Sequence, residues 1–201
     1  DLGLNGTYLA VRELRQDVPT FWTSLDQEAK SLNELTGVTP PVDADWLAER
    51  IVGRTKDGAL LCPGKPLAAA KDGQPRNDAL FFHSDVRGLG CPVGSHVRRS
   101  NPRDGLAKDA QSCAGILHST NNHRILRRGR KFGRPIADLR KEDGEKRGIL
   151  FMSINADIER QFEFVQQNWV LNPHFATLFN EVDPLIGRQG PMTLPGEPLR
   201  R

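Results

Sequence analysis

The segment GILFMSIN, residues 148–155, restricts the fold of this chain more than any other part of the sequence because it is almost continuously apolar. Such a run is typical of a buried β-strand. Residues 157–169 follow at once and place apolar side chains at helical spacing, namely Ile158, Phe162, Val165 and Trp169. The sequence therefore predicts a buried strand followed by a helix that packs one apolar face against the sheet.

A similar pair of elements opens the chain. Residues 6–14 alternate in polarity and include threonine, tyrosine and valine, which predicts a strand. Residues 16–35 carry apolar side chains at helical spacing, and Gly37 with the prolines after it ends that helix. We expect a shorter helix over residues 45–52, capped by Asp43 or Asp45.

Residues 54–90 differ from these segments because they are rich in glycine, proline, aspartate and lysine and show little periodicity. We expect a long irregular insertion here, packed in part through Phe81 and Phe82. The tail from Asp183 is rich in proline and glycine and predicts no strand. The order of elements indicates an α+β domain of the ferredoxin-like kind, with an antiparallel sheet and helices on one face.

The composition fits one globular domain. The chain has 201 residues, of which 37% are apolar and 26% are charged. No apolar run approaches the roughly 18 residues of a membrane span, so we expect no membrane partner. Cys62, Cys91 and Cys113 lack CxxC spacing, which argues against a zinc site or a disulfide framework, and we expect reduced thiols.

The charge is unevenly placed although the net charge is only +3. Ten lysines and arginines but only two aspartates lie between Ser95 and Arg134. Such a basic patch suits nucleic acid, an acidic protein, or the carboxylates or phosphates of a cofactor, and composition alone does not choose among them.

The basic patch contains the segment CPVGSHVRRSNPRD, residues 91–104, in which arginines follow His96 at positions +2, +3 and +7. Nearby positive charge keeps an imidazole neutral and able to ligate a metal. One histidine is a poor zinc site, and a histidine on a solvated basic loop is the ordinary alternative. A haem, however, needs only one protein ligand on its proximal side, and arginines suit its two propionates.

The sequence resembles the C-terminal half of a dye-decolorising (DyP-type) haem peroxidase. The resemblance rests on residues 91–104, on HRILRRGRKFG at 123–133, and on RGILFMSINADIERQFEFVQQNW at 147–169. Supporting segments are NGTYLAVRELRQDVPTFW at 5–22, WLAERIVGRTKDGALL at 46–61 and DPLIG at 183–187. These motifs occur in the family's order through nearly the whole chain.

The resemblance implies a cofactor and a set of site residues. The cofactor is haem b (iron protoporphyrin IX), with His96 as the proximal iron ligand and Arg103 as the partner of a propionate. Arg127 corresponds to the distal arginine, which stabilises negative charge as the O–O bond of peroxide breaks. Ile149 and Phe151 are expected against the distal haem face, although a plain core role also explains them.

A proximal histidine usually donates its second N–H to a carboxylate. Asp157, just after the apolar strand, is our candidate for this partner and for a catalytic role. Glu159 and Glu163 are alternatives, and an ordinary place at a helix N-terminus or on the surface suits all three.

Two departures from the family pattern predict an incomplete site. The distal aspartate of the family lies in a GxxDG motif, which this sequence lacks, and the chain ends before the family's aromatic final strand. We therefore expect residues 1–201 to be a C-terminal half that needs a complementary N-terminal chain as its partner. The expected small molecules are hydrogen peroxide and small aromatic reductants, and a homo-oligomer stays open.

Two alternatives belong to other classes of function. One is a haem-binding subunit without catalysis, which the missing aspartate favours. The other is a nucleic-acid module that uses basic side chains as phosphate contacts, but the basic run offers only Phe132 for stacking, and we expect no nucleic-acid partner. The candidates for electron transfer to bulky substrates are Tyr8, Trp22, Trp46 and Trp169.

Overall fold

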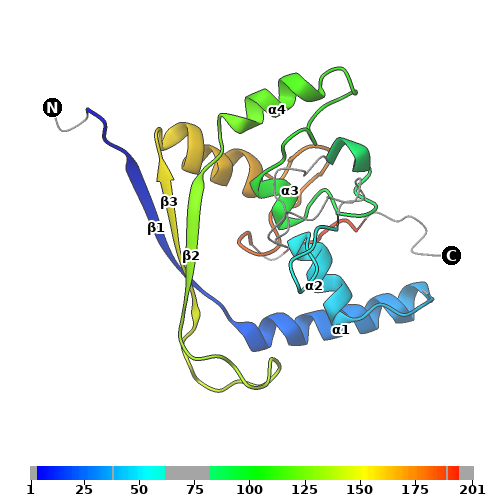
Figure 1. Ribbon diagram of the computed structural model, residues 1–201. Helices are drawn as coiled ribbons and strands as arrows, with labels where there is room; N and C mark the ends of the chain where they lie inside the picture. Colours follow the sequence, from blue (N-terminus) through cyan, green and yellow to red (C-terminus); the bar gives the residue numbers. More distant parts are fainter. Residues whose placement is uncertain (1–3, 38, 62–81, 189, 195–201) are drawn as a thin grey trace, which may run out of the picture.

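The computed structural model describes residues 4–37, 39–61, 82–188 and 190–194 (Figure 1). A sheet forms one side of the molecule, and most of the helices lie on the other (Figure 1). No helix in these ranges is both long and apolar enough to cross a membrane.

The sheet has three antiparallel strands in the order β1-β3-β2. Strand β3 (Gly148–Asn155) lies in the centre and pairs with β1 (Tyr8–Arg15) on one side and β2 (Leu126–Phe132) on the other. A central strand has neighbours along both edges, which agrees with the apolar character of residues 148–155. The strands predicted over residues 6–14 and 148–155 are thus confirmed as β1 and β3.

The first two helices match their predicted positions and caps. Helix α1 (Val18–Thr36) ends at Gly37, whose φ of 59° is left-handed, and α2 (Ala44–Val52) begins after Asp43. The Asp43 carboxylate accepts a hydrogen bond from the backbone N–H of Trp46 at 2.7 Å, as an N-cap does. The two helices share an apolar core made by Leu25, Ala29, Ala44 and Leu47.

The helix after β3 is confirmed, but its turns are wider than those of an α-helix. It consists of two π-helical stretches, η2 (Glu159–Glu163) and η3 (Val165–Val170). The N–H of Leu171, for example, bonds to the carbonyl of Gln166 at 2.9 Å, five residues back. Trp169 is buried in the core that η3 forms with Phe175.

Four elements were not predicted: β2, the short 3-10 helix η1 (Phe82–Asp85), the short helix α3 (His96–Ser100) and helix α4 (Cys113–Asn121). The sequence of β2 is LRRGRKF, and nearly all of it is exposed because it forms an edge of the sheet. An exposed, basic edge strand lacks the alternating apolar pattern that predicts strands, so its pairing with β3 decides its conformation.

The expected insertion is described only in part. Residues 62–81, which include Cys62 and Phe81, lie outside the described residues. The insertion ends in a short 3-10 helix, η1 (Phe82–Asp85), and Phe82 is fully buried against Cys91. The expected packing of Phe82 is thus confirmed.

The two faces of the sheet differ in what covers them. Phe151 of β3 lies 6.1 Å from Phe162 of η2 between ring centroids, so this helix covers the face that also carries Ala10 and Ser153. We call it the helix face. The opposite face, here the open face, carries Leu9, Val11, Leu126 and Ile154, whose exposed fractions range from 43% to 71%.

Arg99 ties α3 to the segments around η3. Its guanidinium is fully buried and donates hydrogen bonds to four backbone carbonyls. The acceptors belong to Trp169, Val170, Asn172 and Glu181, at 2.8 to 3.4 Å. One cation therefore donates hydrogen bonds to backbone carbonyls at the end of η3 and in the loop that follows it.

Replacement of Arg99 by methionine should lower the free energy of unfolding by on the order of 3 kcal/mol, because four buried carbonyls lose a charged donor. The same change at the exposed Arg87 should cost no more than about 0.5 kcal/mol. Urea unfolding of both variants measures the difference. Equal midpoints for the two variants would show that Arg99 does not hold α3 in place.

Candidate functional site

His96 is the first residue of α3, and its imidazole is paired with a buried carboxylate. Its Nδ1 lies 2.7 Å from Oδ2 of Asp183, which is completely buried, whereas the His96 side chain is 34% exposed. The other oxygen of Asp183, Oδ1, accepts backbone N–H groups of Leu185 and Ile186. An ionised carboxylate only accepts, so the proton of a neutral His96 lies on Nδ1, and Nε2 keeps its lone pair.

The partner of His96 is therefore Asp183, and the prediction of Asp157 was wrong. Asp157 lies at the start of the helix after β3, where its Oδ1 accepts the backbone N–H of Arg160 at 3.0 Å. Its Oδ2 lies 3.6 Å from Nε of the same arginine. This carboxylate has the ordinary role of a residue at a helix N-terminus.

Sequence reasoning missed the role of Asp183 although the DPLIG segment was recognised. Asp183 follows His96 by 87 residues, and no spacing rule connects the two. The available signal was an aspartate just before a proline, which favours a turn in which the carboxylate bonds to its own backbone. That signal marks the turn and says nothing about the histidine.

Arg127, Ile149 and Phe151 share the helix face of the sheet. Arg127 pairs with Ser153 and Gly129 pairs with Phe151, so residues 127 and 129 of β2 face the same way as 149, 151 and 153 of β3. A Cβ at Gly129 would lie 3.2 Å from Cγ2 of Ile149, so the glycine leaves room for that side chain. An exposed arginine thus lies beside a half-buried apolar surface.

Arg128, the neighbour of Arg127, points the other way. It pairs with Met152 and belongs to the open face. The side chains of Arg127 and Arg128 therefore lie on opposite faces of the sheet, with Arg127 on the helix face.

Arg103 is buried just after α3. Its φ of 51° is left-handed, which is uncommon for a residue with a Cβ. Its carbonyl accepts the hydroxyl of Thr120 in α4 at 2.9 Å, which ties this backbone to the next helix. The backbone of Arg103 is thus fixed just after the helix that carries His96.

The end of α2 connects His96 with Arg127. A Cβ at Gly53 would lie 2.2 Å from Cγ1 of Val97 and 3.0 Å from Oγ of Ser95, the two residues on either side of His96. Burial first, and the positive charge of Arg127 second, lower the pKa of the Arg54 guanidinium below its usual value. Arg54 therefore lies against the His96 segment and within electrostatic range of the sheet.

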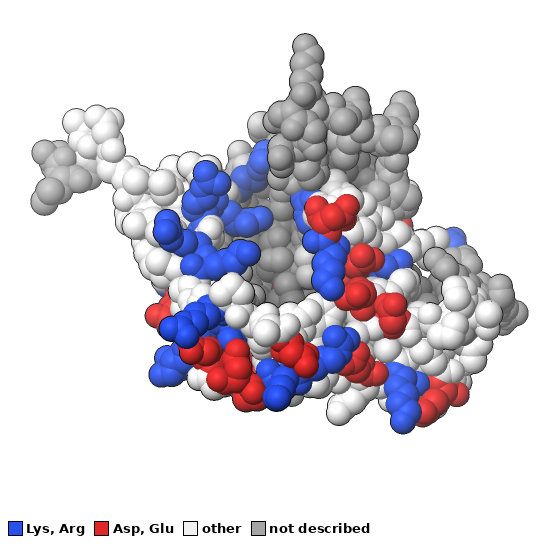
Figure 2. Space-filling view, turned by 60° about the horizontal axis from the view of Figure 1, so that its bottom comes forward, with Lys and Arg blue, Asp and Glu red and all other residues white. Residues whose placement is uncertain are grey.

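The surface of the molecule is hollowed on one face. Figure 2 shows this hollow with lysine and arginine side chains on both of its sides and aspartate and glutamate side chains beside them on one side. The chemistry of the surrounding groups fits a haem: one imidazole with its Nε2 lone pair, arginines for carboxylates, and the apolar Ile149 and Phe151. No cluster of three metal-binding side chains occurs among the residues that the structure describes.

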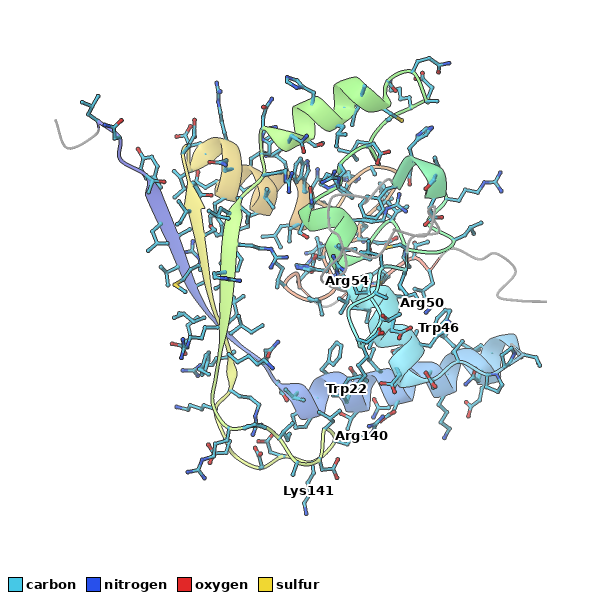
Figure 3. The ribbon with its side chains drawn as sticks, viewed as in Figure 1. Trp22, Trp46, Arg50, Arg54, Arg140 and Lys141 are labelled. Atoms are coloured by element: carbon cyan, nitrogen blue, oxygen red, sulfur yellow. The ribbon has the colours of Figure 1, made fainter. Side chains whose placement is uncertain are left out.

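The aromatic candidates for electron transfer differ in their surroundings. Trp169 is buried, whereas Tyr8 is exposed. Trp22 and Trp46 pack at the edge of the α1–α2 core, and each lies under a cation (Figure 3). Cζ of Arg50 is 3.9 Å from the Trp46 ring, and Cζ of Arg140 is 5.7 Å from that of Trp22. These contacts give the two tryptophans a packing role.

The chain was compared with family models, with curated proteins and with solved structures. No family model matches the chain. Among curated proteins, it is 34% identical to dye-decolorizing peroxidase msp1 of Mycetinis scorodonius over an alignment of 194 residues that covers 91% of this chain and 35% of the relative. It is 32% identical to the multifunctional dye peroxidase DyP2 of Amycolatopsis, covering 91% of this chain and 39% of the relative.

Solved structures agree. A DyP-type peroxidase of Anabaena superimposes with a TM-score of 0.75 and 29% identity, covering 96% of this chain and 40% of that protein. The chain is similar to DyP-type peroxidases. The resemblance seen in the sequence is thereby confirmed, and so is the ferredoxin-like α+β fold.

A second DyP-type structure, from Auricularia auricula-judae, gives a TM-score of 0.67 with 26% identity, over 92% of this chain and 43% of that one. The chain thus spans 35% to 43% of the length of these DyP-type relatives.

Exchange of Asp183 for asparagine should invert the tautomer of His96. The amide oxygen of the variant stays with the N–H groups of Leu185 and Ile186, so its NH₂ group faces Nδ1 and the proton moves to Nε2. NMR of the isotopically labelled imidazole distinguishes the two tautomers. Asp109→Asn on the surface is the control, and a proton that stays on Nδ1 in Asp183→Asn would contradict the assignment.

Proposed function

We propose that the chain belongs to a haem peroxidase that uses hydrogen peroxide to oxidise dyes and phenolic compounds in one-electron steps. The observation that carries this proposal is the His96–Asp183 hydrogen bond, which directs the Nε2 lone pair of a half-exposed imidazole away from the protein core. The similarity to dye-decolorizing peroxidases supports the proposal. The proposed cofactor is haem b.

His96 binds the iron through Nε2, and Asp183 holds the proton on Nδ1 and fixes the orientation of the ring. Asp183 is itself oriented by two backbone N–H groups, so the imidazole cannot rotate without breaking several hydrogen bonds. When bound, the haem supplies the two-electron reduction of peroxide and the one-electron oxidation of the reductant. Arg103 binds a propionate.

Arg127 would act on the peroxide from strand β2. It stabilises the negative charge that develops on the departing oxygen of peroxide. Ile149 and Phe151 lie beside it on the helix face and exclude water from the same surface. An arginine next to apolar side chains has a stronger electrostatic effect than one surrounded by water.

A complementary N-terminal chain completes the distal pocket in this proposal. The sequence lacks a GxxDG motif, so the acid that moves the peroxide proton comes from another segment. Residues 1–201 then act as the C-terminal half of the peroxidase.

The haem proposal predicts a Soret band that depends on His96. The chain, alone or mixed with the part of a relative that it does not match, should bind added haem, and His96→Ala should lose the band while keeping its circular dichroism. The exposed His118 on α4 supplies the control variant His118→Ala. Wild-type chain that binds no haem in either mixture would refute the proposal, as would an unchanged band in His96→Ala.

Arg127 and Arg128 form a matched pair that separates an enzyme from a haem carrier. In the complemented protein, Arg127→Leu should slow the reaction with peroxide by about 10²-fold or more, because the departing oxygen loses its cation. Haem affinity should stay within about twofold. Arg128→Leu, on the open face, should react as the wild type does, and stopped-flow absorbance measures both rates. Equal rates for all three proteins would favour a non-catalytic haem-binding subunit.

A further inference from the structure

Arg54 lies near His96, within the family-like segment at 46–61, but it is not among the expected site residues. It follows Gly53, the residue that ends α2 with a φ of 90°. Because the Cα of Gly53 packs directly against Ser95 and Val97, the next residue lies beside the start of α3. Figure 3 shows Arg54 at this end of α2.

The conformation of Arg54 is fixed by the turn that follows it. Its backbone forms an antiparallel bridge with Leu60, and its Nη1 donates a hydrogen bond to the carbonyl of Gly58 at 2.8 Å. Its own N–H bonds to the carbonyl of Glu49 at 3.2 Å. The hydrogen bond to Gly58 anchors one nitrogen of the guanidinium, a planar group with five N–H donors that suits a carboxylate.

Two arginines thus flank the short helix that carries His96. Arg54 lies at the start of α3, whereas Arg103 follows its end. A haem carries two propionate carboxylates, and a bidentate arginine is the strongest neutral-pH partner that a side chain offers to each. Arg54 is partly buried and within electrostatic range of Arg127, so burial and that neighbour both disfavour its positive charge, which a bound carboxylate stabilises.

We propose that Arg54 is a second carboxylate contact for the haem and binds one propionate from the side of α2, while Arg103 binds the other. The inference rests on the proposed function, because it requires a haem that His96 ligates. It assigns a cofactor-positioning role to α2, which otherwise contributes only its packing against α1 and α3. Arg54 thereby connects the α1–α2 core to the cofactor.

The test measures how tightly two variants of one turn bind haem and a form of haem without carboxylates. Arg54→Met keeps the apolar stem and removes the charge, and Lys56→Met makes a similar change at an exposed side chain that pairs with Asp45. Soret titration of the apoprotein, complemented as above, should give a Kd for haem about tenfold higher in Arg54→Met and unchanged in Lys56→Met. With haem dimethyl ester, which lacks both carboxylates, Arg54→Met and wild type should bind equally.

Each contrary outcome has a distinct meaning. Arg54→Met that binds haem as tightly as the wild type overturns the inference and leaves the proposed function intact. An equal loss for haem and for its ester also overturns it, because Arg54 would then act through the fold. Wild-type protein that binds neither form refutes the proposed function itself. Circular dichroism of both variants establishes that the chain is folded in every titration.

Discussion

The buried hydrogen bonds of Arg99 hold together the part of the molecule on which the site depends. Helix α3 has only five residues, and a helix of this length has no stability of its own. Arg99 links it to four carbonyls of the segment from Trp169 to Glu181, and His96 links it to Asp183. The histidine is therefore positioned by contacts with residues about 70 to 90 positions further along the chain.

Much of the fold was predictable because its elements carry their own signals. Strand β3 is apolar throughout, α1 and α2 have apolar faces, and Asp43 and Gly37 mark helix ends. Strand β2 was not predictable, since a basic edge strand has no apolar alternation and depends on its pairing with β3. Helix α3 was missed for a related reason: tertiary hydrogen bonds, rather than helix propensity, hold it.

The candidate site divides in the same way. His96, Arg103 and Arg127 became candidates because they lie within short motifs of a recognisable family. Ile149 and Phe151 became candidates because the resemblance places them there and strand alternation turns both to one side. Asp183 and Arg54 were not found, because what distinguishes them is proximity in space. Asp157 was chosen for its place after the apolar strand, but the chain turns there into a helix whose first turn uses the carboxylate.

Gly53 brings the end of α2 into close contact with the segment that carries His96. Its left-handed φ of 90° turns the chain at the end of α2, and its missing side chain lets that backbone lie directly on Ser95 and Val97. The side chains of Ser95 and Val97 fill the space between the two backbones at this point, so a side chain at residue 53 would push them apart. The α1–α2 pair is therefore packed closely against the histidine segment. Gly53 thus determines how closely α2 approaches the segment that carries the proposed iron ligand.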